Sequence, residues 1–502
     1  MEALQMLFSG FALALEPSNI LMAALGAFVG TMVGVLPGLG PTSAIAILLP
    51  LTAVLPPTQA IIMLAGIYYG AMYGGSSTAI LLNIPGEVAS VPTCLDGYPM
   101  AQQGRGGPAL GIAAIGSFIA GIMGIIALTF FAPLFAEQAL KFGPPEYFAL
   151  MLLALTIVVS LGGASIGKAL AMGFFGYLLS LIGLGTMTNM PRLTFGYTPL
   201  WGGLDVIGVV IGLFAISEVL NGIEEKKIAI SMGNIGSVFP GLKDLKQSIK
   251  SIFRGGALGF FMGLLPGCSP AVTTFLAYDL EKKCSKTPER FGKGAIEGVA
   301  APESANNATS SAGFIPLFAL GIPASPPLAV LLGGLMIYGL TPGPLLFEQN
   351  GDFVWAVIAR MFIGNVMCLV LNLPLVGLWA RLTQIPYGIL APIILLISIV
   401  GAYTVRNDMF DVLVALIFGV LGYFMNKFNW PVVPFIICFI LGPMLERSLL
   451  QSFGMAFENP FIFFQRPISL TLLVATGIFL VVSLKLRRRT QSRIDNSGFE
   501  VK

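Results

Sequence analysis

Gly263–Thr274 reads GLLPGCSPAVTT, and this stretch places strong limits on how the chain can fold. It is followed by EGVAAPESANNATSS at Glu297–Ser311 and by GIPASPP at Gly321–Pro327, in a chain that is otherwise almost wholly apolar. Irregular, polar backbone at membrane depth is tolerated only where it is buried in protein or lines a watery cavity. We therefore expect a site for a transported solute within residues 255–326.

A similar stretch occurs near the N-terminus. Residues 30–44 read GTMVGVLPGLGPTSA and residues 259–273 read GFFMGLLPGCSPAVT, so that two glycines, a Pro-Gly pair and a second proline coincide. NIPGE at 83–87 likewise resembles GIPAS at 321–325. Two Gly- and Pro-interrupted apolar segments in corresponding halves indicate a transporter binding site. The alternative is a chance match, because both residues are common in membrane helices.

The composition is that of a polytopic membrane protein. The chain has 502 residues, of which 56% are hydrophobic and 10% charged, and its mean hydropathy is +0.88. We expect an all-α protein with about 10 to 14 transmembrane helices of roughly 20 residues each. It should contain two inverted repeats, each carrying a re-entrant or broken helical hairpin. Histidine is absent, which excludes His-based catalysis and most zinc sites.

Basic residues gather at 224–254, at 281–293 and at the C-terminus, and these segments are predicted to be cytoplasmic. The expected organisation is a first membrane repeat at 1–222, a cytoplasmic basic linker at 223–254, a second membrane repeat at 255–486 and a cytoplasmic tail at 487–502. Residues 255–280 have basic segments on both sides, so they should form a hairpin that enters and leaves on the cytoplasmic side. The N-terminal counterpart should enter from the opposite face.

Other apolar stretches are predicted to span the membrane as helices. In the first half a hairpin is expected at 20–55, and the stretch at 59–84 should be interrupted by YGGSST at 73–78. Further spans are expected at 108–135, 147–161, 168–184, 200–220, 353–378, 386–403, 409–424, 432–445 and 468–486.

A helix that begins at the tip of a hairpin presents unpaired N–H groups and the positive end of its dipole, which together suit a carboxylate. Serine and threonine add hydroxyl donors, and glycine lets the backbone approach closely. The alternative is a simple helix kink whose hydroxyls bond to backbone carbonyls. The candidate substrate-binding residues are Pro37, Gly38, Gly40, Thr42, Ser43, Ser76, Ser77 and Asn83 in the first half, and Pro266, Gly267, Ser269, Thr273 and Ser325 in the second.

Glu303, Ser304, Asn306 and Asn307 form the most polar run in an apolar context. A carboxylate is costly at membrane depth unless it is paired or wetted. Carboxylate, hydroxyl and amide oxygens suit a cation such as Na⁺, and a carboxyl can instead carry H⁺. This run is the candidate cation-coupling site, with no cofactor beyond that ion. The alternative is a cytoplasmic loop continuing from Lys293.

Enzyme activity has little support in the sequence. GGASIGKA at 162–169 is close to a phosphate-binding loop, but Ala169 stands where Ser or Thr must hold Mg²⁺. The chain therefore should not hydrolyse ATP. With no histidine and no paired intramembrane aspartates, an intramembrane enzyme is also disfavoured, and nothing in the net charge of +3 indicates a nucleic-acid partner.

Several blocks occur together in order: GVLPGLGPTSAIAILLPLT, LAGIYYGAMYGGSSTAILLNIPGE, LDGYPMAQQGRGGPALGIAAIGSF, GLLPGCSPA, APESANNA and MIYGLTPGP. From about residue 18 to about residue 480 the chain resembles the large membrane subunit of tripartite tricarboxylate transporters, the TctA family. The resemblance covers nearly the whole chain, but it supplies no residue-level site.

The resemblance implies a secondary transporter in the bacterial inner membrane with two protein partners. These are a small four-helix membrane subunit and a periplasmic solute-binding protein that delivers the anion. It further implies uptake of citrate-like tricarboxylates or related carboxylates, driven by a Na⁺ or H⁺ gradient. A stand-alone anion carrier or channel is the alternative.

Overall fold

The computed structural model describes residues 2–36, 39–52, 55–161, 165–224, 237–382, 385–456, 459 and 461–497. Within these residues the fold is helical, and its sheet is one antiparallel pair that joins Gly183 to Arg192 and Leu184 to Pro191. This confirms the predicted all-α membrane protein. The chain divides into two compact units, Met1–Ala139 with Leu204–Phe428 (unit 1) and Leu140–Gly203 with Asn429–Lys502 (unit 2).

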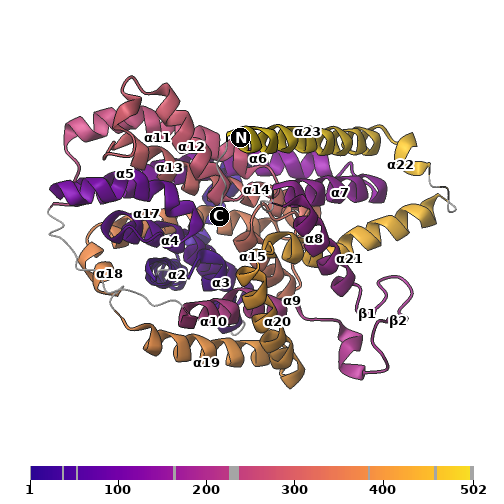
Figure 1. The fold of residues 1–502 in the computed structure, drawn as a ribbon. Helices are drawn as coiled ribbons and strands as arrows, with labels where there is room; N and C mark the ends of the chain where they lie inside the picture. The colour runs from indigo at the N-terminus through magenta and orange to yellow at the C-terminus, as the bar shows by residue number, and fades with distance from the viewer. Residues whose placement is uncertain are drawn as a thin grey trace. The chain divides into compact units, whose positions relative to one another are not determined.

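Unit 1 contains both Gly- and Pro-rich segments and most of the predicted site residues. Its elements, drawn in Figure 1, are α1 (Glu2–Ala14), α2 (Pro17–Val35), α3 (Pro41–Thr52), α4 (Pro57–Leu82), η1 (Val88–Ser90), α5 (Val91–Met100), η2 (Ala101–Arg105), α6 (Gly106–Ala139), α9 (Val206–Val210), η4 (Ile211–Ile216), α10 (Ser217–Glu224), α11 (Leu242–Gly263), α12 (Pro270–Cys284), η5 (Pro288–Arg290), α13 (Glu297–Ala312), α14 (Phe314–Leu320), α15 (Pro326–Ile337), α16 (Pro344–Gln349), α17 (Gly351–Asn372), α18 (Val376–Leu382), α19 (Tyr387–Arg406) and α20 (Met409–Lys427).

Unit 2 is smaller and is built around α21, which packs on α7 and α8. Its elements are α7 (Pro144–Leu161), α8 (Ile166–Ser180), β1 (Gly183–Leu184), β2 (Pro191–Arg192), η3 (Thr198–Gly202), α21 (Val432–Met455), α22 (Ile462–Gln465) and α23 (Pro467–Ser497).

Seven helical segments within the described residues are long and apolar enough to cross a membrane, judged by length and composition: Pro17–Val35, Val88–Ala139, Val206–Glu224, Gly351–Asn372, Tyr387–Arg406, Met409–Lys427 and Val432–Met455. Five shorter apolar helices add Pro41–Thr52, Pro144–Ser160, Ile166–Ser180, Pro326–Ile337 and Pro467–Ser483. The predicted count of about 10 to 14 crossings therefore depends on how many of the shorter helices also cross.

The first broken hairpin is formed by α2 and α3, and its direction follows from glycine contacts. A Cβ atom added at Gly30 would lie 2.3 Å from the carbonyl oxygen of Ile67, and one at Gly34 would lie 2.3 Å from that of Ala71. The contacts advance together along both helices, so α2 and α4 run parallel. The intervening α3 must therefore run back in the opposite direction, as a hairpin requires.

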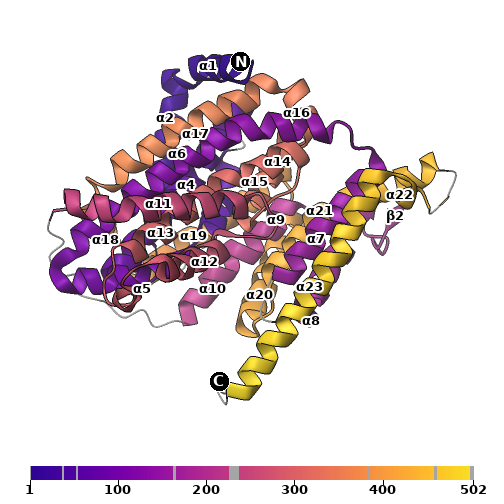
Figure 2. The same ribbon diagram turned by 90° about the horizontal axis from the view of Figure 1, so that it is seen from above.

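The second broken hairpin, α11 with α12, repeats this arrangement. A Cβ atom at Gly259 would lie 2.5 Å from the carbonyl oxygen of Ala305, and one at Gly263 would lie 2.6 Å from that of Thr309. Helices α11 and α13 are thus parallel and α12 returns between them; the three lie side by side in both views (Figures 1 and 2). The predicted broken hairpins are confirmed in both halves.

One predicted interruption is wrong. The YGGSST stretch at 73–78 does not break the second apolar segment, because α4 continues through it to Leu82. Its glycines serve close packing, since a Cβ atom at Gly74 would lie 2.5 Å from the carbonyl oxygen of Thr31 on α2. A buried helix satisfies its own backbone groups, so two glycines there are tolerated.

We call α2, α3 and α4 the first hairpin group and α11, α12 and α13 the second. Helices α4 and α13 run antiparallel where these two groups meet. The hydroxyl of Tyr69 donates to Ser311 Oγ at 3.1 Å, and that of Ser76 donates to Glu303 at 2.5 Å. The residue number of the partner on α13 thus decreases as the residue number on α4 increases. An inverted repeat would produce this opposite direction; the inverted repeat itself stays a prediction.

The compact units do not follow the two predicted repeats, because each unit combines helices from both halves. In unit 2, α8 packs on α21, and a Cβ atom at Gly176 would lie 2.2 Å from the carbonyl oxygen of Phe435. In unit 1, η4 packs on α20, and a Cβ atom at Gly212 would lie 2.5 Å from the carbonyl oxygen of Ala415. Part of the predicted linker is also helical, since α11 begins at Leu242, while residues 225–236 lie outside the described residues. The repeat boundaries stay a prediction.

Candidate functional site

The candidate site lies in an apolar setting where α4, α5, α6, α11 and α13 come together. A cluster of buried hydrophobic side chains from these helices, including Ile80, Ile112, Ile252 and Val299, packs at this junction. Glu303 lies on α13 in the same region, and its exposed fraction is 1%. The alternative that the 303–307 run is a cytoplasmic loop is therefore wrong, because the run lies within a buried helix.

The carboxylate of Glu303 is held by two hydroxyls from the first half of the chain. Ser76 on α4 donates to Oε2 at 2.5 Å, and Thr93 on α5 donates to Oε1 at 2.5 Å. No lysine or arginine of the described chain forms an ion pair with it. Burying a carboxylate without a cationic partner costs free energy. This position is therefore suitable for reversible binding of a cation.

The residues that follow Glu303 leave several oxygens without partners. Asn306 donates through Nδ2 to Glu87 Oε1 at 3.4 Å, and Asn307 donates to the carbonyl oxygen of Glu303 at 3.1 Å. Among the described residues, Ser304 Oγ and the Oδ1 atoms of both asparagines are buried without a hydrogen-bond partner. Buried acceptors are normally satisfied, so these oxygens fit the predicted binding of a cation or its water.

Around the first break, the NIPGE segment (83–87) lies beside the hairpin. Pro37 and Gly38 lie outside the described residues. A Cβ atom at Gly40 would lie 3.9 Å from the Cβ of Glu87. Ser43 is buried, and its hydroxyl donates to the carbonyl oxygen of Phe214 at 2.9 Å, which ties α3 to η4. Thr42 beside it is partly exposed.

Around the second break, the GIPAS segment (321–325) contacts the hairpin. Gly267 has a φ of 82°, which favours glycine, and its N–H donates to the carbonyl oxygen of Ala324 at 3.0 Å. Pro266 is partly exposed, and Ser269 caps α12 without a side-chain hydrogen bond to its backbone. Thr273 Oγ1 donates back to the Ser269 carbonyl at 3.2 Å.

The remaining predicted residues are divided among three environments. Ser325 begins α15 and lies 3.4 Å from the hydroxyl oxygen of Tyr68. Ser77 is buried and lines a small cavity that Ser76 also lines. Asn83 is exposed and ends α4 in the left-handed conformation, with its N–H bonded to Thr78. Backbone capping accounts for Asn83, whereas Ser76 is in direct contact with the candidate cation site.

Sequence reasoning missed Thr93 and Glu87, although one signal was available. Glu87 and Asp96 are the only acidic residues between Glu16 and Glu137. Isolated acidic residues in an apolar region are energetically costly to bury, and they are usually functional or paired. Thr93 lies between them, on α5.

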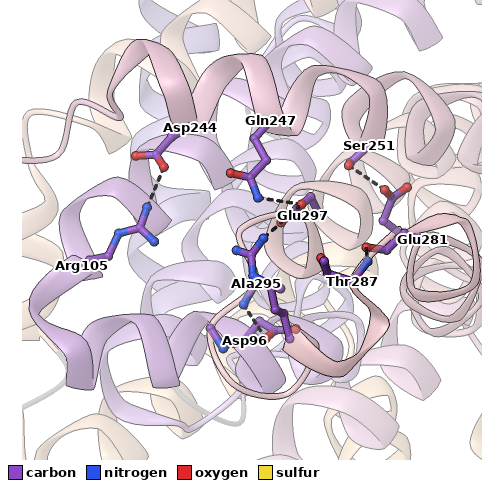
Figure 3. Close-up of polar contacts among 12 residues, drawn as sticks. Asp96, Arg105, Asp244, Gln247, Ser251, Glu281, Thr287, Ala295 and Glu297 are labelled. Atoms are coloured by element: carbon purple, nitrogen blue, oxygen red, sulfur yellow. Dashed lines mark hydrogen bonds and ion pairs between the residues drawn. The ribbon is translucent and has the colours of Figure 1, made fainter.

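Asp96 fixes the segment that leads into α13. Its Oδ1 accepts the backbone N–H groups of residues 292–295, including Gly294 and Ala295 at 2.8 Å each, and its Oδ2 accepts the hydroxyl of Tyr278 at 2.9 Å. Figure 3 shows the contact between Asp96 and Ala295 beside other polar pairs, among them Arg105 with Asp244. These contacts connect α5 and η2 to α11, α12 and the segment before α13.

Comparison with known proteins identifies the family of the chain. A profile of the tripartite tricarboxylate transporter TctA family matches residues 20–437. The chain belongs to the TctA family. It is 42% identical over 483 residues, 96% of each chain, to an uncharacterized 52.8 kDa protein in the TAR-I ttuC' 3' region of Agrobacterium vitis. It is 40% identical over 226 residues to a protein in the TAR-II ttuC' 3' region of the same organism, covering 45% of this chain and 93% of that one. No solved structure matches the chain.

Membership of the TctA family makes the chain a multi-pass membrane subunit of a tripartite tricarboxylate transporter, a system that includes other subunits. The family is one of transporters and not of enzymes, in agreement with the sequence prediction. In the described part of this TctA-family chain, the run at 303–307 is one of the places where polar side chains are buried in the apolar interior.

Proposed function

We propose that this TctA-family chain is the permease that imports tricarboxylates or related carboxylate anions by symport with Na⁺ or H⁺. It acts in the bacterial inner membrane, with its C-terminus in the cytoplasm. Its partners are a small four-helix membrane subunit and a periplasmic solute-binding protein. The observation that carries the proposal is the buried Glu303 carboxylate. It lies on α13, accepts hydrogen bonds from Ser76 on α4 and Thr93 on α5, and has no cationic partner among the described residues.

The two breaks are the proposed binding sites of the substrate carboxylates. Helix α3 begins at Pro41 and α12 at Pro270, each directly after a break. The first N–H groups of such helices are unpaired within the helix, and the dipole favours an anion there. Ser269, whose side chain makes no cap bond, adds a hydroxyl donor. The substrate thus meets hydrogen-bond donors without a fixed positive charge, which also permits release.

The 303–307 run is the proposed coupling site. Entry of an anion into an interior that already contains a carboxylate is unfavourable unless a cation accompanies it. Na⁺ beside the Glu303 carboxylate, or H⁺ on the carboxyl, would remove that penalty. The cation gradient would then drive uptake of the anion.

Vesicle uptake tests these roles separately. The complete three-component system is supplied with labelled tricarboxylates and dicarboxylates, while Na⁺ and pH gradients are set independently. Glu303→Gln keeps the shape and one acceptor oxygen, so it should flatten the dependence of rate on the cation and leave substrate affinity nearly unchanged. Ser269→Ala should weaken affinity about 10- to 100-fold, the loss of one hydroxyl donor to a charged group. Glu289→Gln, at an exposed carboxylate, is the control for charge removal.

Two results would contradict the proposal. Unaltered cation dependence in Glu303→Gln would remove the coupling role. Full-rate, high-affinity uptake by this chain without the binding protein would instead favour a stand-alone carrier.

A further inference from the structure

A small cavity adjoins the residue that holds Glu303. It is lined by Tyr73, Ser76 and Ser77 on α4, by Ser117 and apolar neighbours on α6, and by Asn372 at the end of α17. Its volume of about 20 Å³ accommodates about one water-sized occupant. Small-molecule sites are commonly about 300–1,000 Å³, so a tricarboxylate does not fit here.

Three of the four hydroxyls that line the cavity direct their hydrogens to partners outside it. Ser76 donates to the Glu303 carboxylate at 2.5 Å, and Ser117 donates to the Glu303 carbonyl oxygen at 3.4 Å. Tyr73 donates to Asn365 Oδ1 at 2.8 Å. A hydroxyl has one hydrogen and two lone pairs, so each of these groups retains only acceptor capacity toward the cavity.

Asn372 behaves in the same way. Its Nδ2 donates to the carbonyl oxygen of Cys368 at 2.8 Å and to Thr31 Oγ1 at 3.3 Å. Because the carbonyl can only accept, this contact fixes which end of the amide is nitrogen. The side chain is 5% exposed, and its Oδ1 has no hydrogen-bond partner among the described residues. An orphaned acceptor therefore belongs to a residue that lines the cavity.

Charge distinguishes between possible occupants. None of the lining side chains is a carboxylate, and neutral hydroxyl and amide groups do not take up a proton near neutral pH. The carboxylate of Glu303 is one hydrogen bond away through Ser76. A single carboxylate at that distance balances one positive charge, and hard cations prefer oxygen ligands.

We propose that this cavity binds one Na⁺ ion through oxygens of Ser76, Ser77, Ser117 and Asn372, with Glu303 as its counter-charge. The inference rests on the proposed symport and selects Na⁺ as its coupling ion. Hydrogen bonding from Ser76 to the carboxylate makes its oxygen more electron-rich, so the ion senses the charge of Glu303 without touching it. Filling this site stabilises the ionised carboxylate.

The test is ion-specific thermal stabilisation of the purified chain in detergent, titrated with NaCl against KCl and choline chloride at constant ionic strength. Wild type should be stabilised by Na⁺ alone. Ser77→Ala and Ser117→Ala each remove one oxygen and little volume, and each should raise the half-effective Na⁺ concentration about tenfold. Ser398→Ala, a buried hydroxyl on α19 that also lacks a hydrogen-bond partner among the described residues and does not line the cavity, should respond like wild type.

The outcomes separate the site from the transport proposal. Equal responses to the three salts, or unchanged Na⁺ titrations in both serine variants, would mean that the cavity contains structural water only and would overturn the inference. Carboxylate uptake driven by a pH gradient without Na⁺ would also overturn it while leaving symport intact. Na⁺ stabilisation lost in the serine variants, in a chain that imports no carboxylate, would support the site and refute the proposed function.

Discussion

Replacing Asp96 by alanine should destabilise the second hairpin group more than any surface charge change. The carboxylate accepts five hydrogen bonds, four of them from consecutive backbone N–H groups at 292–295. Gly292 and Gly294 have φ angles of 80° and 101°, a backbone shape that turns these N–H groups toward a single acceptor. The segment ends where α13 begins at Glu297, six residues before Glu303.

The magnitude follows from which donors become orphaned. The N–H groups of Gly294 and Ala295 make buried bonds, whereas those of residues 292 and 293 are partly buried and can turn to water. Each buried donor without an acceptor costs about 1–3 kcal/mol. Asp96→Ala should therefore cost about 2–6 kcal/mol, a large share of the roughly 5–15 kcal/mol that stabilises a typical domain. Asp96→Asn keeps one acceptor oxygen and should lose less.

Thermal unfolding in detergent and transport rate are the measurements. Asp279→Ala is the matched control on α12, because Asp279 pairs with Lys283 in solvent, with side chains 58% and 71% exposed. Such an exposed pair contributes about 0.3–0.5 kcal/mol. Asp96→Ala should unfold at a clearly lower temperature than the control. It should also lower the maximum uptake rate, since α13 is no longer fixed at its start.

Equal unfolding temperatures for Asp96→Ala and Asp279→Ala would refute this reasoning. It would mean that water replaces the carboxylate at 292–295 without cost. A protease-accessibility change confined to residues 285–296 in Asp96→Ala alone would support the assignment of the loss to this loop.

Three further predictions concern packing, orientation and charge. Gly259→Ala places a Cβ atom 2.5 Å from a backbone carbonyl oxygen of α13 and should reduce the yield of monodisperse protein, whereas Gly364→Ala, with no atom within 4 Å, should not. Cys284 is exposed and the other four cysteines are buried, so an impermeant maleimide should label one thiol, from the cytoplasmic face only; labelling in intact cells would reverse the orientation. Arg254→Met deprives the buried Glu281 of its ion pair and should lower stability by about 1–3 kcal/mol; an unchanged unfolding temperature would show that the pair contributes nothing.

The local features of the fold follow from sequence because they depend on neighbouring residues. Closely spaced prolines and glycines, as in LPGLGP and LPGCSP, favour the end of a helix, since proline lacks an N–H and clashes with the preceding turn. The glycines spaced by four residues before each break also predict a close helix contact. The same signals misled at 73–78, because two glycines without a proline do not break a helix that is packed on both sides.

The sequence by itself determined a helical membrane protein, two broken hairpins and a polar run at 303–307. Only the tertiary structure decided that this run is buried, that Ser76 and Thr93 hold Glu303, and that Asp96 fixes the approach to α13. These pairs are separated by about two hundred positions, so no periodicity in the sequence records them. Whether a carboxylate in an apolar chain is a surface loop residue or a buried charge depends on which distant helices cover it, and that is settled only when the two hairpin groups pack together.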